Sequence, residues 1–178
     1  MKFLIIGNQN AITYKEIFPL IKDGKIWLGA GFPGNVGFFE SRYADVAKAS
    51  QHRENMIRVS GVHWYTNLDH DGHHQDLPLY KHYDPDAYPK YDNYDAIEVS
   101  KTAEIPDDYD GVMGVPITFL DKYDPDQFEI IWTSDRGGDG YLEFMRKPHT
   151  RFDAPVVNGK GIYKRIFIRN KHPKTPQT

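Results

Sequence analysis

The sequence predicts a mixed α/β domain, and three features carry that prediction. Residues 2–28 contain an apolar run, a segment with helical spacing and a second apolar run, which is the order of a strand–helix–strand unit. Residues 54–68 are rich in β-branched and aromatic side chains, which favour strands. Residues 109–131 place glycines and prolines beside apolar runs, which indicates a tight, buried crossing of the core.

The composition limits the class of protein. The 178 residues are enough for a core, and we interpret residues 1–178 as a single domain or part of one. A net charge of −3 argues against a protein that coats nucleic acid. The absence of cysteine excludes disulfides and thiolate chemistry and fits a cytoplasmic protein. No apolar run approaches the roughly 18 residues of a membrane span, so no membrane partner is expected.

The first elements follow from apolar spacing. Residues 2–6 form a continuous apolar run, which predicts a buried strand of the parallel type. Residues 11–22 have helical spacing, although Pro19 favours a kink or an end there. Residues 26–28 predict a second short strand.

A glycine-rich segment comes next. Residues 29–34 fit the G-x-G-x-x-G pattern of dinucleotide-binding loops. Pro33 removes a backbone amide that such a loop needs, and no acidic residue closes a second strand about 20 residues later. We therefore favour a glycine-rich connector over a phosphate-binding loop.

The middle of the chain combines predicted strands with a histidine-rich insert. Residues 38–49 are predicted as a helix, and residues 54–68 as strands with a turn or bulge at Ser60-Gly61. The insert 69–75 invites a metal site, with possible ligands Asp69, His70, Asp71, His73 and His74. Gly72 opposes a helix there, so we favour a solvated loop without a metal.

The second half is predicted to alternate loops and strands. Residues 77–95 contain three prolines and several tyrosines, so we expect an extended loop whose tyrosines either cover the core or stack on bases. Short strands are predicted at 96–99 and 128–132, and a longer one at 162–169 after a hairpin turn at Asn158-Gly159. Residues from about 171 to 178 are predicted to form a disordered tail.

Three strings in order carry a resemblance to a known family. They are FLIIGNQNAITYKEIFPLIK (3–22), WYTNLDH (64–70) and YDGVMGVPITFLDKYDPDQFEII (109–131), with weaker similarity in NGKGIYKRIFIR (158–169). Together they resemble the C-terminal half of EcoRI-like adenine-specific DNA methyltransferases, which are restriction–modification enzymes. The resemblance implies the second half of a Rossmann-like methyltransferase sheet with added β-rich target-recognition elements.

The same resemblance implies a division of labour with another segment. The complete family enzyme transfers a methyl group from S-adenosylmethionine to the exocyclic amine of adenine in double-stranded DNA. This sequence contains neither the Pro-Pro turn nor the Phe-x-Gly-x-Gly cofactor loop of the family. We therefore expect no bound cofactor and no activity for this chain alone, and an N-terminal half, possibly separate, that carries both motifs.

The resemblance also assigns site residues. Asn8 and Asn10 would border the active-site cleft, and Trp64, Tyr65 and Asn67 would lie near the flipped adenine. Sheet packing for the two aromatic residues and an ordinary turn for Asn67 are the alternatives.

Late basic residues are the candidates for DNA-phosphate contacts: Lys160, Lys164, Arg165 and Arg169. A solvated strand face is an equally weighted alternative. Two rival functions remain open: a non-catalytic DNA- or protein-binding module, and, less favoured, a metal-dependent hydrolase using Asp69, His70, His73 and His74.

Overall fold

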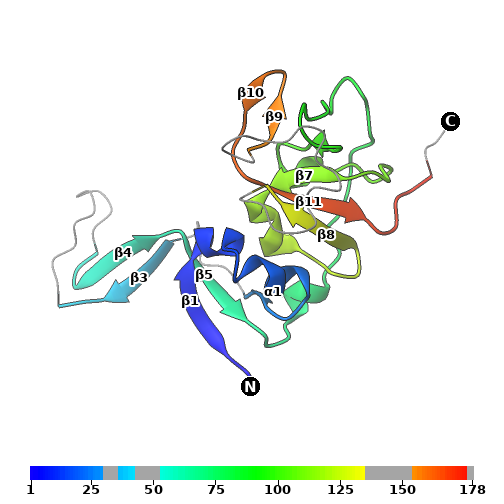
Figure 1. Ribbon diagram of the computed structural model, residues 1–178. Coiled ribbons are helices and arrows are strands. Elements are labelled where there is room, and N and C mark those ends of the chain that lie inside the picture. Colours follow the sequence, from blue (N-terminus) through cyan, green and yellow to red (C-terminus); the bar gives the residue numbers. More distant parts are fainter. Residues whose placement is uncertain (30–35, 43–52, 135–153, 176–178) are drawn as a thin grey trace.

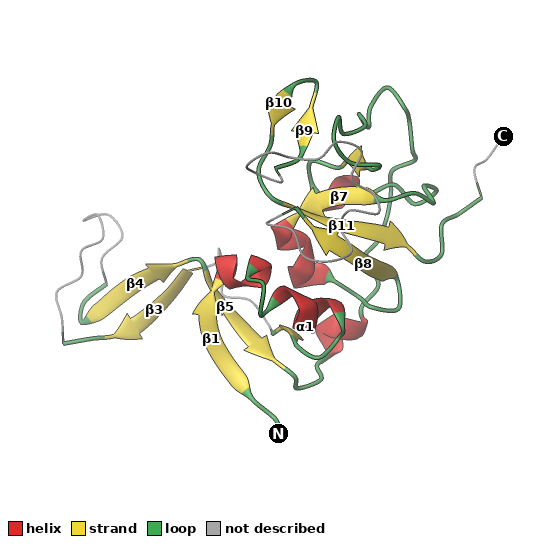
Figure 2. Ribbon diagram, in the orientation of Figure 1, coloured by secondary structure: helices red, strands yellow, loops and turns green. Residues whose placement is uncertain are grey.

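The computed structural model describes residues 1–29, 36–42, 53–134 and 154–175. It is mixed α/β, with strands that dominate over a few short helices (Figures 1 and 2). The described helices are 3₁₀ segments apart from α1 (Phe18–Lys22). None of them is long and apolar enough to cross a membrane.

A small antiparallel sheet contains the first strand. Its order is β1 (Leu4–Asn8), β5 (Val62–Thr66), β2 (Trp27–Leu28), and both pairings with β5 are antiparallel. The prediction of a buried, parallel-type strand at 2–6 is therefore wrong. Within the described ranges β1 pairs on one side only, and its residues Leu4, Ile5 and Ile6 are 54%, 55% and 44% exposed.

The segment predicted as one helix is divided in two. Residues Gln9–Thr13 form the 3₁₀ helix η1, and α1 follows after a turn. Pro19 lies in the first turn of α1, where its missing amide costs no helical hydrogen bond. Proline therefore starts the second helix and does not kink a longer one.

A two-stranded ribbon extends away from the rest of the molecule (Figure 1). We call β3 (Val36–Glu40) and β4 (Met56–Ser60) the arm; they pair antiparallel over five residues each. The helix predicted at 38–49 is wrong at residues 38–40, which belong to β3, because pairing with β4 overrides weak helical spacing. Residues 43–52 lie outside the described residues, as do 30–35 of the glycine-rich connector.

The second sheet has the order β6 (Ile97–Glu98), β7 (Met113–Pro116), β11 (Arg165–Asn170), β8 (Phe128–Thr133). The pair β6–β7 is parallel, and β11 is antiparallel to both of its neighbours. The predicted buried crossing is confirmed as β7, the 3₁₀ helix η6 (Ile117–Lys122) and β8.

Both faces of this sheet are covered. Ile166 and Ile168 of β11 belong to a large apolar cluster that also contains Phe18 and Leu28 from the N-terminal elements. Phe167 points to the opposite face and packs with Tyr91 and Tyr94. Double-sided burial explains why residues 162–169 show no clean alternation of polar and apolar side chains.

The tyrosine-rich segment 77–95 contains no regular helix, as predicted. Tyr88, Tyr91 and Tyr94 are buried and cover the core, whereas Tyr80 is 81% exposed. Of the two interpretations of this loop, core packing holds for the three buried tyrosines.

Short elements complete the described chain. They are η4 (Asp71–His74), η5 (Thr102–Glu104) and the hairpin β9 (Val156–Val157)–β10 (Lys160–Gly161). The predicted turn at Asn158-Gly159 is confirmed, with φ angles of 50° and 75° that suit a two-residue hairpin turn.

The beginning of the expected disordered tail makes specific contacts. The amide of Lys171 donates to the carbonyl of Gln127 at 2.9 Å. The amide of Lys174 donates to the carbonyl of Asp107 at 2.7 Å, and its ammonium lies 2.8 Å from the Asp107 carboxylate. Residues 171–174 are therefore held against the body of the molecule.

Candidate nucleic-acid interface

The carboxyl end of β1 carries the first two predicted site residues on one turn. The Oδ1 atom of Asn8 accepts a hydrogen bond from the Asn10 amide at 2.8 Å and so caps η1. The carbonyl of Asn10 accepts from the Thr13 hydroxyl at 3.1 Å. Both asparagine residues are exposed, and their place at the border of an active-site cleft stays a prediction.

Tyr65 supports this turn from the inside. Its side chain is buried, and its hydroxyl donates to the carbonyl of Asn8 at 2.8 Å. Burial raises the pKa of Tyr65 to about 12. A Cβ added to Gly7 would come within 2.9 Å of the Tyr65 ring, so glycine at that position allows the close approach. The ring is thus a core group and presents no open face to a base.

Trp64 and Tyr65 point to opposite faces of the sheet, because neighbouring strand residues alternate. Trp64 is half-buried beside Gly29, whose amide donates to the Trp64 carbonyl at 3.0 Å. A Cβ added at Gly29 would lie 3.0 Å from the Trp64 Cβ. The two aromatic residues therefore do not line one pocket from the same face.

Asn67 lies at the other end of β1. Its Oδ1 accepts from the Phe3 amide and its Nδ2 donates to the Met1 carbonyl, both at 2.9 Å. The register pairs Leu4 with Thr66 and Asn8 with Val62, so the length of β1 separates Asn67 from Asn8. Four residues of strand span about 13 Å. The side chain of Asn67 fastens the N-terminal segment to the end of β5.

The four predicted phosphate ligands also divide into separate places. Lys160 is exposed on the β9–β10 hairpin, and Arg169 is half-exposed, 3.4 Å from the Glu129 carboxylate. The Lys164 ammonium lies 3.2 Å from the Thr13 hydroxyl, which places it beside the Asn8–Asn10 turn. Of the four predicted phosphate ligands, Lys164 is therefore the one that lies on the predicted substrate side.

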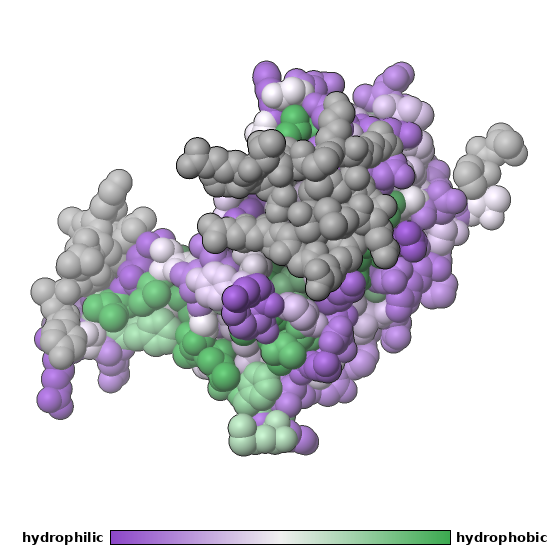
Figure 3. Space-filling model, viewed as in Figure 1, coloured by the Kyte–Doolittle hydropathy of each residue, from purple (hydrophilic) through white to green (hydrophobic). Residues whose placement is uncertain are grey.

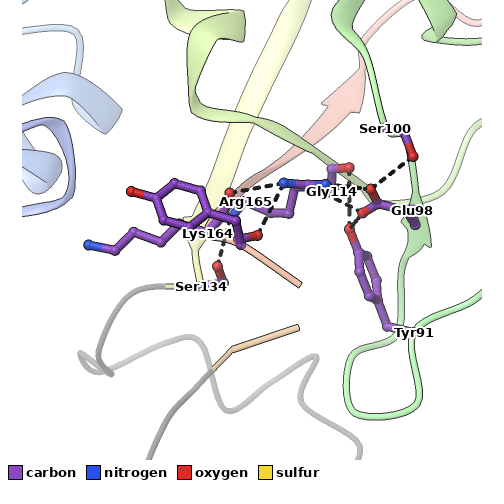
Figure 4. Close-up of polar contacts among 8 residues, drawn as sticks. Tyr91, Glu98, Ser100, Gly114, Ser134, Lys164 and Arg165 are labelled. Carbon is purple, nitrogen blue, oxygen red and sulfur yellow. Dashed lines mark hydrogen bonds and ion pairs between the residues drawn. The ribbon is translucent and has the colours of Figure 1, made fainter. Parts of the chain in front are cut away.

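Arg165 is a structural ion-pair residue (Figure 4). Its Nη2 lies 2.6 Å from Oε1 of Glu98, and its Nε donates to Oε2 at 3.0 Å. The two side chains are only 12% and 7% exposed. Burial lowers the pKa of the guanidinium, but the hydrogen bond and charge of Glu98 raise it more, so its net pKa is raised.

The Tyr91 hydroxyl completes this buried group. It donates to Oε2 of Glu98 and lies 3.3 Å from the Gly114 carbonyl. Burial raises the pKa of Tyr91, and the charge of Glu98 raises it further. The phenol therefore stays protonated. A Cβ at Gly114 would collide with the Tyr91 hydroxyl. Glu98 was not singled out in the sequence analysis. A carboxylate within the apolar run 96–99 indicates a buried charge that needs a partner, and this signal could have identified it.

The histidine-rich insert brings three possible metal ligands together. One ligand atom each from Asp69, His73 and His74 lies within 4.8 Å of the others. Asp69 already pairs with His74 at 2.6 Å, which raises the pKa of His74 and lowers that of Asp69. His73 is buried against the Trp27 ring, with centroids 4.5 Å apart, and burial lowers its pKa. His70 is directed to the carbonyl of Leu28 at 2.9 Å.

A family model described as adenine-specific methyltransferase EcoRI matches residues 1–171. The chain belongs to this family of adenine-specific methyltransferases. It is 46% identical over 177 residues to the Type II methyltransferase M.EcoRI of Escherichia coli, covering 96% of this chain and 50% of that relative.

Two mycoplasma relatives are more distant. The chain is 32% identical over 187 residues to the Type II methyltransferase M.MgeORF184P of Mycoplasma genitalium and 33% identical over 186 residues to M.MpnI of Mycoplasma pneumoniae. Each alignment covers 96% of this chain and 57% of the relative. The chain thus spans about half the length of the curated relatives it matches. No solved structure matches it.

Proposed function

We propose that this chain is the C-terminal portion of a site-specific DNA adenine methyltransferase. In the complete enzyme, S-adenosylmethionine supplies the methyl group that is transferred to the exocyclic amine of adenine. This chain contributes part of the base pocket and of the DNA-recognition surface, and it has no methyl-transfer activity alone. The alternative is a non-catalytic DNA- or protein-binding module derived from such an enzyme.

The exposed edge of β1 is the observation that carries this proposal. Leu4, Ile5 and Ile6 form an apolar strand whose side chains are about half exposed, and β1 pairs only with β5 in the described chain. Figure 3 shows apolar side chains gathered over this region. An apolar strand with an unpaired edge is a site for addition of another strand. We expect the half of the enzyme that carries the cofactor loop and the Pro-Pro turn to contact β1 at this edge.

The residues of this chain then divide by role. Asn8 and Asn10, exposed on one turn, stay assigned to the substrate side, and Lys164 beside them to a DNA phosphate. Tyr65 positions that turn through its hydroxyl. Trp64 and Asn67 stay candidates for the base side.

Lys160 and Arg169, which are exposed, remain candidates for further phosphate contacts. Arg165 is left out of that set, because Glu98 and two backbone carbonyls occupy its guanidinium.

A hybrid enzyme tests the proposal. The half of M.EcoRI that this chain does not cover is joined ahead of Met1, and the purified protein is incubated with labelled S-adenosylmethionine and duplex DNA. Label on the exocyclic amine of adenine is expected. A hybrid that is folded and binds S-adenosylmethionine but transfers no methyl group would reject the enzymatic role and favour the non-catalytic alternative.

Association of the two halves tests the exposed strand directly. When the halves are produced separately, co-elution in gel filtration is expected, and Ile5→Asp is expected to abolish it. Tyr80→Asp is the matched control, since Tyr80 is 81% exposed in the loop 77–95 and does not belong to β1. Equal co-elution of both variants would remove β1 from the contact.

A further inference from the structure

The arm has no role in the apolar core. None of the residues of the arm and of its described flanks, which together are 36–42 and 53–60, belongs to either of the two buried clusters. Its strands pair with each other over five residues, a length of about 16 Å. The described residues of the arm therefore contribute to the surface of the molecule and not to its buried clusters.

The two faces of the arm differ. Strand alternation puts Gly37, Phe39, Ile57 and Val59 on one face, which is apolar. The other face carries Phe38 with its register partner Arg58, and on either side of them the pairs Val36–Ser60 and Glu40–Met56. The guanidinium of Arg53 stacks 3.8 Å above the centre of the Phe38 ring, so it joins the same face.

This second face carries the guanidinium groups of Arg53 and Arg58 beside the carboxylate of Glu40, and the Phe38 ring holds Arg53 in a fixed geometry. A guanidinium stacked on a ring keeps its in-plane N–H donors at the edge, where they are available to a phosphate or to a guanine. Within the described ranges none of Arg42, Arg53 and Arg58 forms an ion pair with a carboxylate. In the arm and its described flanks, residues 36–42 and 53–60, these three arginines outnumber the two acidic residues, Glu40 and Glu54.

The base of the arm adjoins the proposed substrate side. Gly61, with a φ angle of +66°, turns the chain from β4 into β5. Its carbonyl accepts a hydrogen bond of 2.6 Å from the amide of Gln9, which lies between Asn8 and Asn10. A duplex that reaches the Asn8–Asn10 turn would therefore pass beside the arm.

We propose that the arm contacts duplex DNA through the face formed by Phe38, Arg53 and Arg58. The inference rests on the proposed function for the presence of DNA at the Asn8–Asn10 turn. The major groove of B-DNA, about 12 Å wide, admits a two-stranded β-ribbon. In that position the two arginines lie against the DNA while Phe38 holds Arg53 in place.

Binding of a fluorescent 20-base-pair duplex to the full chain, followed by anisotropy over a range of salt concentrations, tests the arm. Arg53→Ala and Arg58→Ala are each expected to weaken binding about eightfold at 0.1 M salt and to reduce the salt slope by about 0.9, the effect of one lost phosphate contact. Arg53→Lys keeps the charge but loses the planar stack, and an intermediate affinity is expected. Lys101→Ala is the charge-matched control, since Lys101 pairs with Glu104 on an exposed 3₁₀ segment.

The outcomes separate this inference from the proposed function. Arm variants that bind like the wild type, or a wild-type chain that does not bind the duplex at low salt, would overturn a DNA-contacting arm. Neither result bears on methyl transfer by the hybrid enzyme, which is measured independently. Circular dichroism of each variant confirms that a loss of binding is not a loss of folding.

Discussion

Glu98 and Arg165 form an ion pair that crosses over β7, with 2.6 Å between Oε1 and Nη2. Glu98 lies on β6 and Arg165 on β11, the two neighbours of β7 in the sheet. Gly114 of β7 lies at the crossing and leaves room for the Tyr91 hydroxyl. The pair therefore fastens three strands and the tyrosine-rich loop to one another.

Removal of Arg165 is expected to destabilise the fold. Arg165→Ala leaves the Glu98 charge buried without its partner, which typically costs about 3–5 kcal/mol. The free energy of unfolding in urea measures this change. Arg169→Ala is the matched control, because Arg169 and Glu129 are about half exposed and such surface pairs contribute roughly 0–1 kcal/mol. Equal effects of the two substitutions would contradict a structural role for Arg165.

This chain alone is expected to transfer no methyl group. The sequence encodes neither the Pro-Pro turn nor the Phe-x-Gly-x-Gly loop of the family. Incubation with labelled S-adenosylmethionine and mixed-sequence duplex DNA measures transfer, with the hybrid enzyme as positive control. Turnover clearly above a protein-free control would show that the chain carries its own donor site.

The histidine-rich insert is expected to bind no transition metal tightly. The Asp69 carboxylate raises the pKa of His74, and the proton that it stabilises competes with a metal for the His74 ring. Elemental analysis after dialysis should give well under one metal ion per chain. A stoichiometric zinc or nickel content that is lost in His74→Ala would reverse this interpretation.

Asp121 is expected to make the stability depend on pH. Burial raises its pKa above the ordinary value of 3.8, although the neighbouring His63 lowers it in part. Because the folded state then holds the proton more tightly than the unfolded state, this stabilisation is complete below pH 3.8 and is lost as pH rises through the raised folded pKa. Asp121→Asn should thus gain stability relative to wild type with rising pH.

Local patterns predicted those elements whose cause is local. The Asn158-Gly159 turn, the strands within 54–68 and the crossing at β7–β8 follow from turn chemistry and β-branched content, and the structure has them. The apolar run could not predict that β1 is exposed in this chain. Such a run is typical both of a strand that is buried in its own chain and of a strand that a partner covers.

The candidate site was harder to predict than the fold. A basic residue within a predicted strand is typical of a solvent-facing position, and only the arrangement of β6, β7 and β11 brings Glu98 to Arg165. Likewise the family resemblance implied that Tyr65 and Asn67 both lie near the flipped adenine. In the structure the Tyr65 hydroxyl instead reaches the carbonyl of Asn8 at one end of β1, and the Asn67 side chain bonds Phe3 at the other end.

Lys164 and Asn67 are expected to distinguish phosphate contacts from base contacts in the hybrid enzyme. Loss of a phosphate contact in Lys164→Ala should weaken binding to all duplexes about uniformly and flatten the salt slope by about one unit. A base contact at Asn67 should cost roughly 1–3 kcal/mol on the preferred sequence only. Because the Asn67 amide also bonds Phe3 and Met1, Asn67→Ala is measured for unfolding as well as for binding. A variant that loses stability but keeps its sequence preference would mark Asn67 as an anchor for the N-terminal segment alone.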